Sequence, residues 1–510
     1  MNPLHITLLS LWGLIVVAAL LQRGGALEGL RAIERKGAVA MSVGLFALLA
    51  GGLLWRVFFT ITPATEQLIM RGESPADSVA AGFDTKARFR GLAQPLGRIV
   101  DRNGEPLAEY SLRGGHLRRS YPAGPATAHL VGYWTGPVRD GVGIEKGLTL
   151  LNDSLRDDLP HDAQLTIDLR LQRAALTALN GRTGAVVVMD AGNGQVLAAA
   201  NYPTYDPNRV GNDTAWWRWA SDRKTRPLTS RAIKDNFSPG SSIKPLIALA
   251  AHELGTPLPE ESGFACSGQY APGRGITPIT DHGSAHGRIA MPAAMRYSCN
   301  AYFAYLAYRL VGFGPLAEYF DSLGFNQRMR WNTGLFLNEY STLLPAQSWV
   351  RARDVIAQTR IGIGQASVKA NPIHIAVLMS GIANGGTFIR PTLELGRQPD
   401  TLRWSVDRKS VAWLRELLRQ PLMQGGTAAN IFNGLEAKGI IIYGKTGTAD
   451  REPDGREPSW WVSFGQKNRK AYAVVVAIQN RDGQYAGELN APIARSVYQS
   501  LERLGYFGGD

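Results

Sequence analysis

Three short motifs stand in one order along this chain of 510 residues and constrain its fold more than any other feature. A serine three positions before a lysine comes first, a serine two positions before an asparagine comes next, and a lysine-threonine-glycine run comes last. The motifs are Ser241-Ser242-Ile243-Lys244, Ser298-Cys299-Asn300 and Lys445-Thr446-Gly447-Thr448. They supply a nucleophile, its proton acceptor and the wall of a substrate groove if the fold brings all three together.

The first motif occurs twice, in different surroundings. Ser221 and Lys224 lie among charged residues with no apolar periodic segment after them, which is typical of a solvated loop. Ser241 instead follows Gly240, which allows a tight turn, and opens the apolar run of residues 245–251. The second copy is therefore the candidate for chemistry.

The apolar run predicts a buried helix that ends at residues 254–255, with Ser241 at its N-terminus and Lys244 one turn later on the same face. A serine hydroxyl becomes a nucleophile when a base takes its proton, and a lysine acts as that base when its pKa is lowered. Burial and a neighbouring cation such as Lys445 lower a lysine pKa. The alternative, a helix cap followed by a surface lysine, does not explain why all three motifs occur in order.

The lysine-threonine-glycine motif predicts a strand edge that a ligand can approach. The β-rich run of residues 439–444 leads into Lys445, and Gly447 lets a substrate backbone come close. Lys445 and Thr446 could hold a carboxylate there. A hairpin lysine that binds no ligand is the alternative for this segment.

The middle motif precedes the apolar run of residues 302–307, which predicts a helix. Ser298 and Asn300 in that position also suit a simple pair of N-cap residues, and the residues alone leave this alternative open.

The trio resembles the motif set of penicillin-recognising serine acyltransferases. Over roughly residues 90–500, the chain resembles a class B penicillin-binding protein, a monofunctional peptidoglycan transpeptidase. Further landmarks of that family are matched at residues 96–108, 129–133, 141–146, 165–168, 185–190, 362–365, 383–386 and 426–428. The resemblance implies an α/β (mixed α+β) fold, with an antiparallel sheet flanked by helices, a helical subdomain and a small N-terminal pedestal.

The resemblance also implies catalytic roles. Ser241 resembles the acylated nucleophile and Lys244 the general base. Ser298 resembles the proton-relay serine, and Asn300 the donor that steadies the amide of the acyl group. In the family, the serine attacks the D-Ala-D-Ala end of a stem peptide and releases the terminal D-alanine. The amine of a neighbouring stem then resolves the acyl-enzyme and forms a cross-link.

The third motif resembles the family's substrate-binding strand. Lys445, Thr446 and Thr448 match the positions that bind the substrate carboxylate, and Gly447 lies between them. The oxyanion hole would be the backbone N–H groups of Ser241 and Thr448. One departure lies close by: residues 458–461 read Pro-Ser-Trp-Trp, where the family often has a histidine or alanine before an aromatic pair.

Two rival functions remain as alternatives. One is a catalytically silent scaffold of the division or elongation machinery, and the intact motifs count against it. The other is a β-lactam-binding sensor, which usually brings a cytoplasmic effector domain. A bifunctional synthase would need a glycosyltransferase domain ahead of the sheet, and a β-lactamase would need a deacylating base. The sequence does not separate transpeptidation from carboxypeptidase activity, in which water is the acceptor.

Two apolar runs near the N-terminus, residues 3–21 and 37–59, are each long enough to span a bilayer. Four basic residues between the runs predict a cytoplasmic loop, namely Arg23, Arg31, Arg35 and Lys36. The catalytic domain would then lie on the periplasmic or extracellular side of the plasma membrane. One true span plus an interfacial helix is the alternative, because the first run is interrupted by polar residues.

Small residues recur every three or four positions in the second run, at Gly37, Ala40, Gly44, Ala47 and Gly51. Such a seam allows close helix packing in lipid, so we expect it to contact the first span or a membrane partner. The resemblance suggests a membrane-embedded glycan-strand polymerase of the shape, elongation, division and sporulation family. It also implies peptidoglycan stem peptides as substrates and β-lactams as inhibitors.

Composition restricts the remaining possibilities. The net charge of +13 would suit anionic lipids and wall polymers, although a generally solvated basic surface explains it as well. The sequence contains no phosphate-binding loop and no basic-aromatic module of the kind that binds nucleic acid. No cofactor is expected. Cys266 and Cys299 are too few for a disulfide-built scaffold, and whether they pair stays open. No run of residues has metal-ligand spacing, so no metal site is predicted.

The expected organisation has four parts: residues 1–60 as a membrane anchor of two transmembrane helices, 61–83 as a juxtamembrane linker, 84–163 as the pedestal, a dimerisation-like domain, and 164–510 as the transpeptidase domain. Within the last part, two strands are predicted after the third motif, at residues 460–464 and 472–478. The last helix is predicted at residues 489–504.

Overall fold

The structure is a computed structural model that describes residues 97–508 apart from 114–115, 135–160, 211–212, 260–262, 284, 334–339, 342–353, 367, 453–454 and 480–482. The described residues all belong to one compact unit, Thr85–Asp510. Within them, no helix combines the length and the apolar character needed to cross a bilayer. The predicted membrane anchor and juxtamembrane linker lie outside the described residues.

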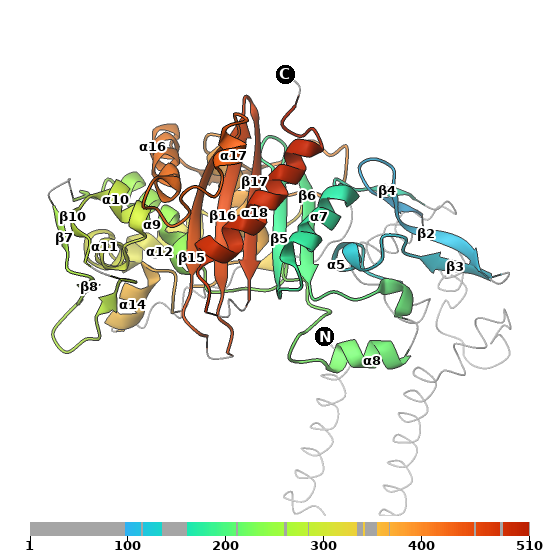
Figure 1. The fold of residues 1–510 in the computed structure, drawn as a ribbon, viewed down its shortest axis with the longest axis horizontal. Coiled ribbons are helices and arrows are strands. Elements are labelled where there is room, and N and C mark those ends of the chain that lie inside the picture. The colour runs from blue at the N-terminus through green and yellow to red at the C-terminus, as the bar shows by residue number, and fades with distance from the viewer. Residues whose placement is uncertain are drawn as a thin grey trace, which may run out of the picture. The chain divides into compact units, whose positions relative to one another are not determined.

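An antiparallel sheet of five strands lies at the centre of the fold (Figure 1). In spatial order its strands are β15 (Ile441–Thr448), β16 (Ser459–Lys467), β17 (Lys470–Ile478), β5 (Gly184–Asp190) and β6 (Val196–Tyr202). Because β17 pairs with β5, segments far apart in the sequence become neighbours. β15, which carries the third motif, is an edge strand as predicted.

The hairpin of β16 and β17 is longer than the sequence predicted. Lys467 pairs with Lys470, so the turn between the strands has only two residues. The first of them, Asn468, adopts a φ of +53°. Asparagine tolerates this left-handed conformation, which two-residue hairpin turns require.

Helices cover both faces of the sheet (Figure 1). Val186 and Val188 point to one face, where they join the core beneath α7 (Leu169–Leu179) and α18 (Ala486–Arg503). Ala185 and Val187 point to the other, in the core that includes α15 (Pro372–Ala383). The strands are therefore apolar on both sides, as expected for a sheet buried between helices. α18 is the predicted last helix, begun three residues earlier.

A group of helices lies beside the β15 edge of the sheet (Figure 1). It comprises α9 (Lys244–Glu253), α10 (Met291–Tyr297), α11 (Asn300–Tyr305), α12 (Phe313–Ser322), α14 (Val355–Ile361) and α16 (Arg408–Arg419). The second motif lies at the junction of α10 and α11, and the first motif leads into α9. This group corresponds to the predicted helical subdomain.

The helix after the first motif differs from the prediction at its start. Ser241 lies in a 3₁₀ turn, η3 (Gly240–Ile243), and the α-helix begins only at Lys244. Pro245 has no N–H to donate to the Ser241 carbonyl, whereas the Lys244 N–H does donate to it. The proline therefore favours a 3₁₀ turn over a full α-turn at the nucleophile. The helix ends at Glu253, as the predicted stop at residues 254–255 requires.

A smaller sheet precedes the central one. Its order is β3 (His116–Ser120), β2 (Pro106–Arg113), β1 (Ile99–Val100) and β4 (Ala163–Gln164), and β1 and β4 run parallel. Buried Asp101 joins it to the transpeptidase region, because its Oδ2 accepts a hydrogen bond of 3.0 Å from the Leu169 N–H at the start of α7. β1, β2 and β3 lie in the region predicted to be the pedestal, and β4 lies across its predicted boundary at residue 163.

The remaining elements are short. Four strand pairs flank the helical group: β7 (Phe264–Cys266) with β10 (Gly287–Ile289), β8 (Gln269–Tyr270) with β9 (Ile279–Thr280), β11 (Arg328–Met329) with β12 (Tyr340–Ser341), and β13 (Thr387–Ile389) with β14 (Thr401–Ser405). The other helical segments are η1 (Gly124–Ala126), α5 (Ala128–Val131), η2 (Pro207–Arg209), α8 (Asp213–Ser221), the π-helical η4 (Leu306–Val311), η5 (Gln420–Leu422) and α17 (Asn433–Glu436).

Candidate active site

The turn that carries Ser241 packs directly against the end of β15. Gly240 has a φ of +53°, and a Cβ atom there would lie 2.4 Å from the Thr448 carbonyl oxygen. A Cβ atom at Gly447 would lie 2.5 Å from the Pro239 carbonyl oxygen. Only glycine allows the two backbones to approach this closely. The first and third motifs are therefore in contact through their main chains.

The two serines of the first motif face different surroundings. The Ser242 side chain is buried, and its hydroxyl donates a hydrogen bond of 2.7 Å to the Pro239 carbonyl. Ser241 is only half-buried. Ser241 is thus the serine of this turn that a substrate can reach.

Lys244 connects the first motif to the second. Its Nζ donates hydrogen bonds to the Ser298 carbonyl over 2.6 Å and to Asn300 Oδ1 over 2.7 Å. Burial lowers the pKa of Lys244 to about 7, although Cys299 and Asp281 act in the opposite direction. The amine can therefore be neutral near neutral pH, as a general base must be.

Two helix ends hold the second motif. Ser298 caps the C-terminus of α10 with a φ of +57°, and Asn300 is the first residue of α11. The Asn300 amide oxygen accepts from Lys244, and its Nδ2 donates a hydrogen bond of 2.9 Å to the Thr280 carbonyl. An amide nitrogen carries two hydrogens, so one is left for a ligand.

The N-cap of α11 is Cys299, whose Sγ accepts a hydrogen bond of 3.3 Å from the Tyr302 N–H. The alternative in which Ser298 and Asn300 form a simple N-cap pair is therefore wrong. Their side chains turn toward Lys244 instead.

Lys445, from β15, also reaches the Ser298 hydroxyl. Its Nζ donates a hydrogen bond of 2.8 Å to Ser298 Oγ and one of 3.1 Å to the Thr446 carbonyl. The Lys244 Nζ lies 3.3 Å from the same hydroxyl. Burial and the neighbouring charge of Lys244 hold the pKa of Lys445 well below its ordinary value. One serine thus lies between two buried lysine nitrogens, a geometry suited to passing a proton.

The third motif has a hydroxyl partner to which the sequence analysis gave no role. Thr427, from the landmark at residues 426–428, lies with its Oγ1 2.8 Å from Thr446 Oγ1. Since either hydroxyl can donate, the pair can turn one O–H toward a ligand. The motif match located this segment but not its contact with β15.

A polar network behind the nucleophile turn escaped the sequence analysis. The Ser238 N–H donates a hydrogen bond of 2.9 Å to Glu452 Oε1, and Lys369 Nζ donates one of 3.0 Å to Ser238 Oγ while pairing with Glu452. Burial of Glu452 raises its pKa, but the hydrogen bonds from Lys369 and Ser238 outweigh this, so the pKa is lowered. No motif marks these residues, because they meet only in the fold.

Trp460 explains the departure at residues 458–461. Its Nε1 donates a hydrogen bond of 2.9 Å to the Ser238 carbonyl, and its ring packs edge-on against Phe237 with centroids 5.8 Å apart. The tryptophan therefore supports the chain that leads into the Ser241 turn.

The copy of the first motif that begins at Ser221 lies outside this site. Ser221 is the last residue of α8, so the prediction of a loop was wrong, although the residue is exposed as expected. Its hydroxyl donates a hydrogen bond of 2.6 Å to the Trp217 carbonyl four residues earlier. This hydroxyl completes a helix end and is remote from the three motifs.

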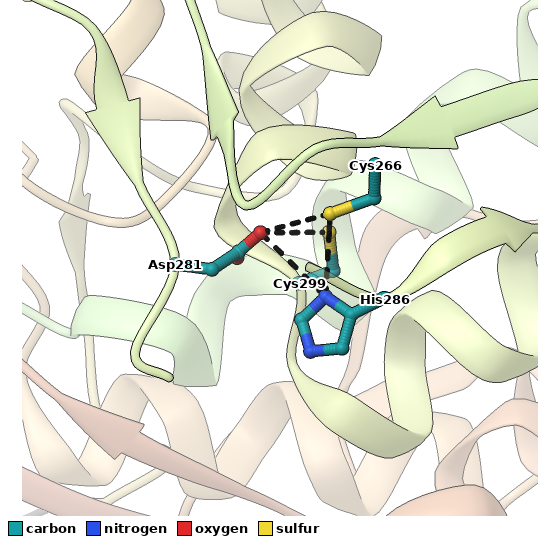
Figure 2. A group of neighbouring side chains, drawn as sticks. All are labelled: Cys266, Asp281, His286 and Cys299. Atoms are coloured by element: carbon teal, nitrogen blue, oxygen red, sulfur yellow. Dashed lines mark hydrogen bonds and ion pairs between the residues drawn. The ribbon is translucent and has the colours of Figure 1, made fainter. Parts of the chain in front are cut away.

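The structure also brings together side chains that the sequence analysis did not connect. Cys266 and Cys299 are both reduced, and their Sγ atoms lie 3.5 Å apart (Figure 2). Asp281 and His286 lie beside them, so that four side chains of metal-ligating types form one group. The sequence analysis predicted no metal site because it considered ligand spacing along the chain. This group is formed from separate segments, so such spacing does not reveal it.

Comparison with known proteins agrees with the geometry of the site. The model of the penicillin-binding protein transpeptidase domain matches residues 184–499, a range that contains all three motifs. Peptidoglycan D,D-transpeptidase PbpA of Mycobacterium tuberculosis is 29% identical over 372 residues, which cover 68% of this chain and 73% of that protein. Peptidoglycan D,D-transpeptidase FtsI of Escherichia coli is 26% identical over 474 residues, with coverages of 84% and 75%.

Solved structures agree as well. The imipenem acyl-enzyme complex of penicillin-binding protein A from M. tuberculosis is 25% identical, has a TM-score of 0.67, and matches 80% of this chain and 99% of that one. The α/β transpeptidase fold predicted from the sequence is thereby confirmed. This chain belongs to the penicillin-binding protein transpeptidase family, as a class B member.

Proposed function

We propose that this protein is a peptidoglycan D,D-transpeptidase that cross-links stem peptides through an acyl-enzyme on Ser241 and releases the terminal D-alanine. The relatives PbpA and FtsI are named for this activity. For this chain the proposal rests on one observation: the Ser298 hydroxyl lies between the nitrogens of Lys244 and Lys445. A silent scaffold has no need of a buried lysine whose pKa is about 7.

Acylation begins when Ser241 Oγ attacks the carbonyl carbon of the penultimate D-alanine. The hydroxyl proton passes to neutral Lys244 Nζ, and the N–H groups of Ser241 and Thr448 bind the resulting oxyanion. The C–N bond then breaks. The departing nitrogen receives its proton from Lys244 through Ser298 Oγ, so charge and protons balance and D-alanine leaves.

The third motif orients the donor peptide in this proposal. The terminal carboxylate binds to Lys445 and to the hydroxyls of Thr446 and Thr448, and Gly447 gives the peptide backbone room. Thr427 supports this role because its hydroxyl contacts that of Thr446. Asn300 offers its remaining amide hydrogen to the acyl group.

Deacylation uses the same groups in reverse. An amine of a neighbouring stem peptide attacks the ester carbon and gives its proton to Lys244, which is neutral again after acylation. The ester C–O bond breaks, Ser241 Oγ regains a proton, and a new amide bond is the cross-link. With water in place of the amine, the product would be a trimmed stem peptide.

The test uses the full chain purified in detergent, with a stem pentapeptide donor and an amine acceptor. We expect D-alanine release and a cross-linked product in equal amounts from the unaltered protein and from Ser221→Ala, and neither from Ser241→Ala. Release of D-alanine without a cross-linked product, in the presence of acceptor, would favour a carboxypeptidase. No D-alanine release and no covalent penicillin labelling of the unaltered protein would favour a scaffold.

We also propose the predicted arrangement at the membrane. Residues 1–60 would anchor the protein, 61–83 would link it, 84–163 would form the pedestal, and the catalytic domain would face the periplasm or exterior. Reporter fusions test the topology: a phosphatase that is active only outside should be active when fused at residue 65. It should be inactive when fused at residue 30, within the basic loop. The opposite pattern would overturn the orientation.

The proposed membrane partner is a glycan-strand polymerase of the shape, elongation, division and sporulation family. The support is the seam of small residues in the second apolar run, which would let two helices pack closely in lipid. Gly44→Leu with Gly51→Leu should abolish co-purification of the polymerase, whereas Val43→Leu, placed off the seam, should not. Unchanged co-purification in the double variant would end this proposal.

A further inference from the structure

The helix α8 carries three tryptophans, and two of them fix it to the rest of the protein (Figure 1). Trp216 packs edge-on against Tyr133, with ring centroids 5.4 Å apart, and the ring of Trp219 lies 5.8 Å from that of Tyr205. Both tryptophans are half-buried and pack against the hydrophobic core. The inner face of the helix is therefore occupied by contacts within the protein.

The third tryptophan, Trp217, lies on the outer face of α8. It is 67% exposed, more than any other large apolar residue that the structure describes. Because a helix turns by about 100° per residue, Trp217 points away from the inner face and shares the outer one with Thr214 and Ser221, which are exposed too. Packing within the protein gives this indole no role.

Three exposed cations accompany the exposed indole. Arg218 follows it on α8, and Arg223 and Lys224 lie in the turn directly after the helix. The carboxylate of Asp222, which lies among them, accepts hydrogen bonds of 2.8 Å from the Thr225 N–H and 2.6 Å from the Thr225 hydroxyl. The segment therefore presents an indole together with a net positive charge.

We propose that Trp217, Arg218, Arg223 and Lys224, here called the α8 surface, dock on the anionic surface of the bilayer in which the chain is anchored. The indole would enter the headgroup layer and the three cations would bind lipid phosphates. Tryptophan favours this layer because its ring is apolar while its N–H needs a polar partner, and neighbouring arginine and lysine are attracted to anionic lipids. The docking rests on the proposed membrane anchor.

The length of the connecting chain supports a contact with the membrane. The second apolar run ends at residue 59, and the described residues begin at Gly97. Since an extended chain spans at most about 3.5 Å per residue, this connection keeps the catalytic unit within about 130 Å of the bilayer. Linking two partners raises their effective concentration, so a contact of low intrinsic affinity would still be populated.

A protein partner is the competing occupant of the α8 surface. Protein interfaces place their aromatic anchors in well-packed pockets, with further contacts that exclude water around them. The neighbours of Trp217 on the outer face, Thr214, Ala220 and Ser221, are instead small and exposed. A single indole that stands out among small and charged residues suits the soft, hydrated headgroup layer better. These features favour lipid as the occupant.

Docking would orient the catalytic unit. Trp216 and Trp219 fix α8 to the core, and the Arg226 guanidinium pairs over 2.6 Å with Asp235 in the segment that leads to Ser241. A bilayer contact on the outer face would therefore restrict the directions in which the active site can face. This consequence rests on the proposed function, whereas the docking itself does not.

A fluorescent probe beside Trp217 tests the docking. Ser221→Cys in the full chain is labelled with a nitrobenzoxadiazole probe, since both native cysteines are buried, and the protein is reconstituted in nanodiscs of phosphatidylglycerol and phosphatidylcholine in equal amounts. Leu254→Cys, at a residue that is 46% exposed, is the matched control. We expect nitroxide-labelled lipid to quench the probe at residue 221 at least about threefold more than at residue 254. Equal quenching at the two positions would overturn the proposal.

Variants in the labelled protein identify the residues responsible. Trp217→Ala, and separately the combination of Arg218→Glu, Arg223→Glu and Lys224→Glu, should reduce quenching to the level of the control position. Ile356→Ala, which removes another exposed apolar side chain, should leave it unchanged. All these side chains are exposed, so we expect each variant to fold and to be labelled by penicillin. Undiminished quenching in both α8 variants would contradict the assignment.

The same experiment separates the docking from the proposals beside it. A chain that stays outside the nanodiscs would defeat the anchor and the docking together, whereas an inserted chain with quenching at the control level would defeat the docking alone. Strong quenching without penicillin labelling of the unaltered protein would defeat only the enzymatic proposal. Quenching at the control level, with a blue shift of the probe only when the polymerase is reconstituted too, would assign the α8 surface to a protein partner and overturn the docking.

Discussion

Lys445 Nζ donates a hydrogen bond of 2.8 Å to Ser298 Oγ, so the edge strand and the helix junction meet at one hydroxyl. Lys244 approaches the same oxygen to 3.3 Å from the start of α9. Burial lowers the pKa of both amines, and the charge of Lys244 lowers that of Lys445 further, so the site disfavours protonation of both lysines at once. The protonation states of Lys244, Lys445 and Ser298 determine most of the behaviour expected of the enzyme.

The acylation rate should rise with pH through about 7. Burial lowers the pKa of Lys244 to about 7, so the amine is protonated below that pH and free to accept the Ser241 proton above it. We expect the second-order rate constant for a chromogenic β-lactam to increase about tenfold per pH unit below 7 and to level off above. A constant rate from about pH 5.5 to about pH 8.5 would remove Lys244 from the role of base.

Ser298→Ala should slow acylation by about 10²–10⁴-fold, because it removes the hydroxyl that transfers the proton to the leaving group. The control is Ser242→Ala, whose buried hydroxyl bonds only to the Pro239 carbonyl. That variant should lose about 1 kcal/mol of stability and stay within a few-fold in rate. Stopped-flow acylation and thermal melting, run on both proteins, check the pair. Equal rates in the two variants would argue against a relay.

Gly240→Ala should abolish acylation and lower the free energy of unfolding by about 3 kcal/mol or more. Its Cβ would lie 2.4 Å from the Thr448 carbonyl oxygen, so the Ser241 turn and β15 would have to separate. Gly255→Ala is the matched control, with a φ of +64° and open space around the added atom. It should cost only the strain of that conformation, about 1 kcal/mol, and leave acylation intact. Similar rates in both variants would contradict this packing argument.

Glu452→Gln should destabilise the Ser241 turn. The substitution removes the negative charge that pairs with Lys369 and Arg456, while the remaining amide oxygen can still accept from Ser238, so we expect a loss of about 1–3 kcal/mol. Arg451→Gln is the control. It breaks the surface ion pair between Arg451 and Glu457 and should lower the free energy of unfolding by less than about 1 kcal/mol. Urea titration measures both. The loss should also appear in the unaltered protein as pH falls, because the lowered pKa of Glu452 means its contribution disappears on protonation.

The sequence predicted the catalytic elements well, because local patterns determine them. The apolar run after Ser241, the β-rich run before Lys445 and the paired strands after it are short-range signals. What it missed near Ser241 has a local cause as well. Pro245 has no N–H to donate to the Ser241 carbonyl. The position of this proline therefore indicates the 3₁₀ turn.

The support of the site could not be predicted in the same way. Lys369, Glu452 and Ser238 come from three separate segments and make one network. Cys266 and Cys299 meet Asp281 and His286 only because β7 pairs with β10 and α11 begins beside them. Such contacts depend on tertiary structure, so neither spacing nor periodicity in the sequence reveals them.

The most direct test of the central claim is to locate the covalent adduct after reaction with a fluorescent penicillin. The full chain is labelled, digested and mapped by mass spectrometry beside Ser241→Ala and Ser221→Ala. We predict one adduct, on Ser241, that persists in Ser221→Ala and vanishes in Ser241→Ala. An adduct on another residue, or a label that survives in Ser241→Ala, would contradict the account.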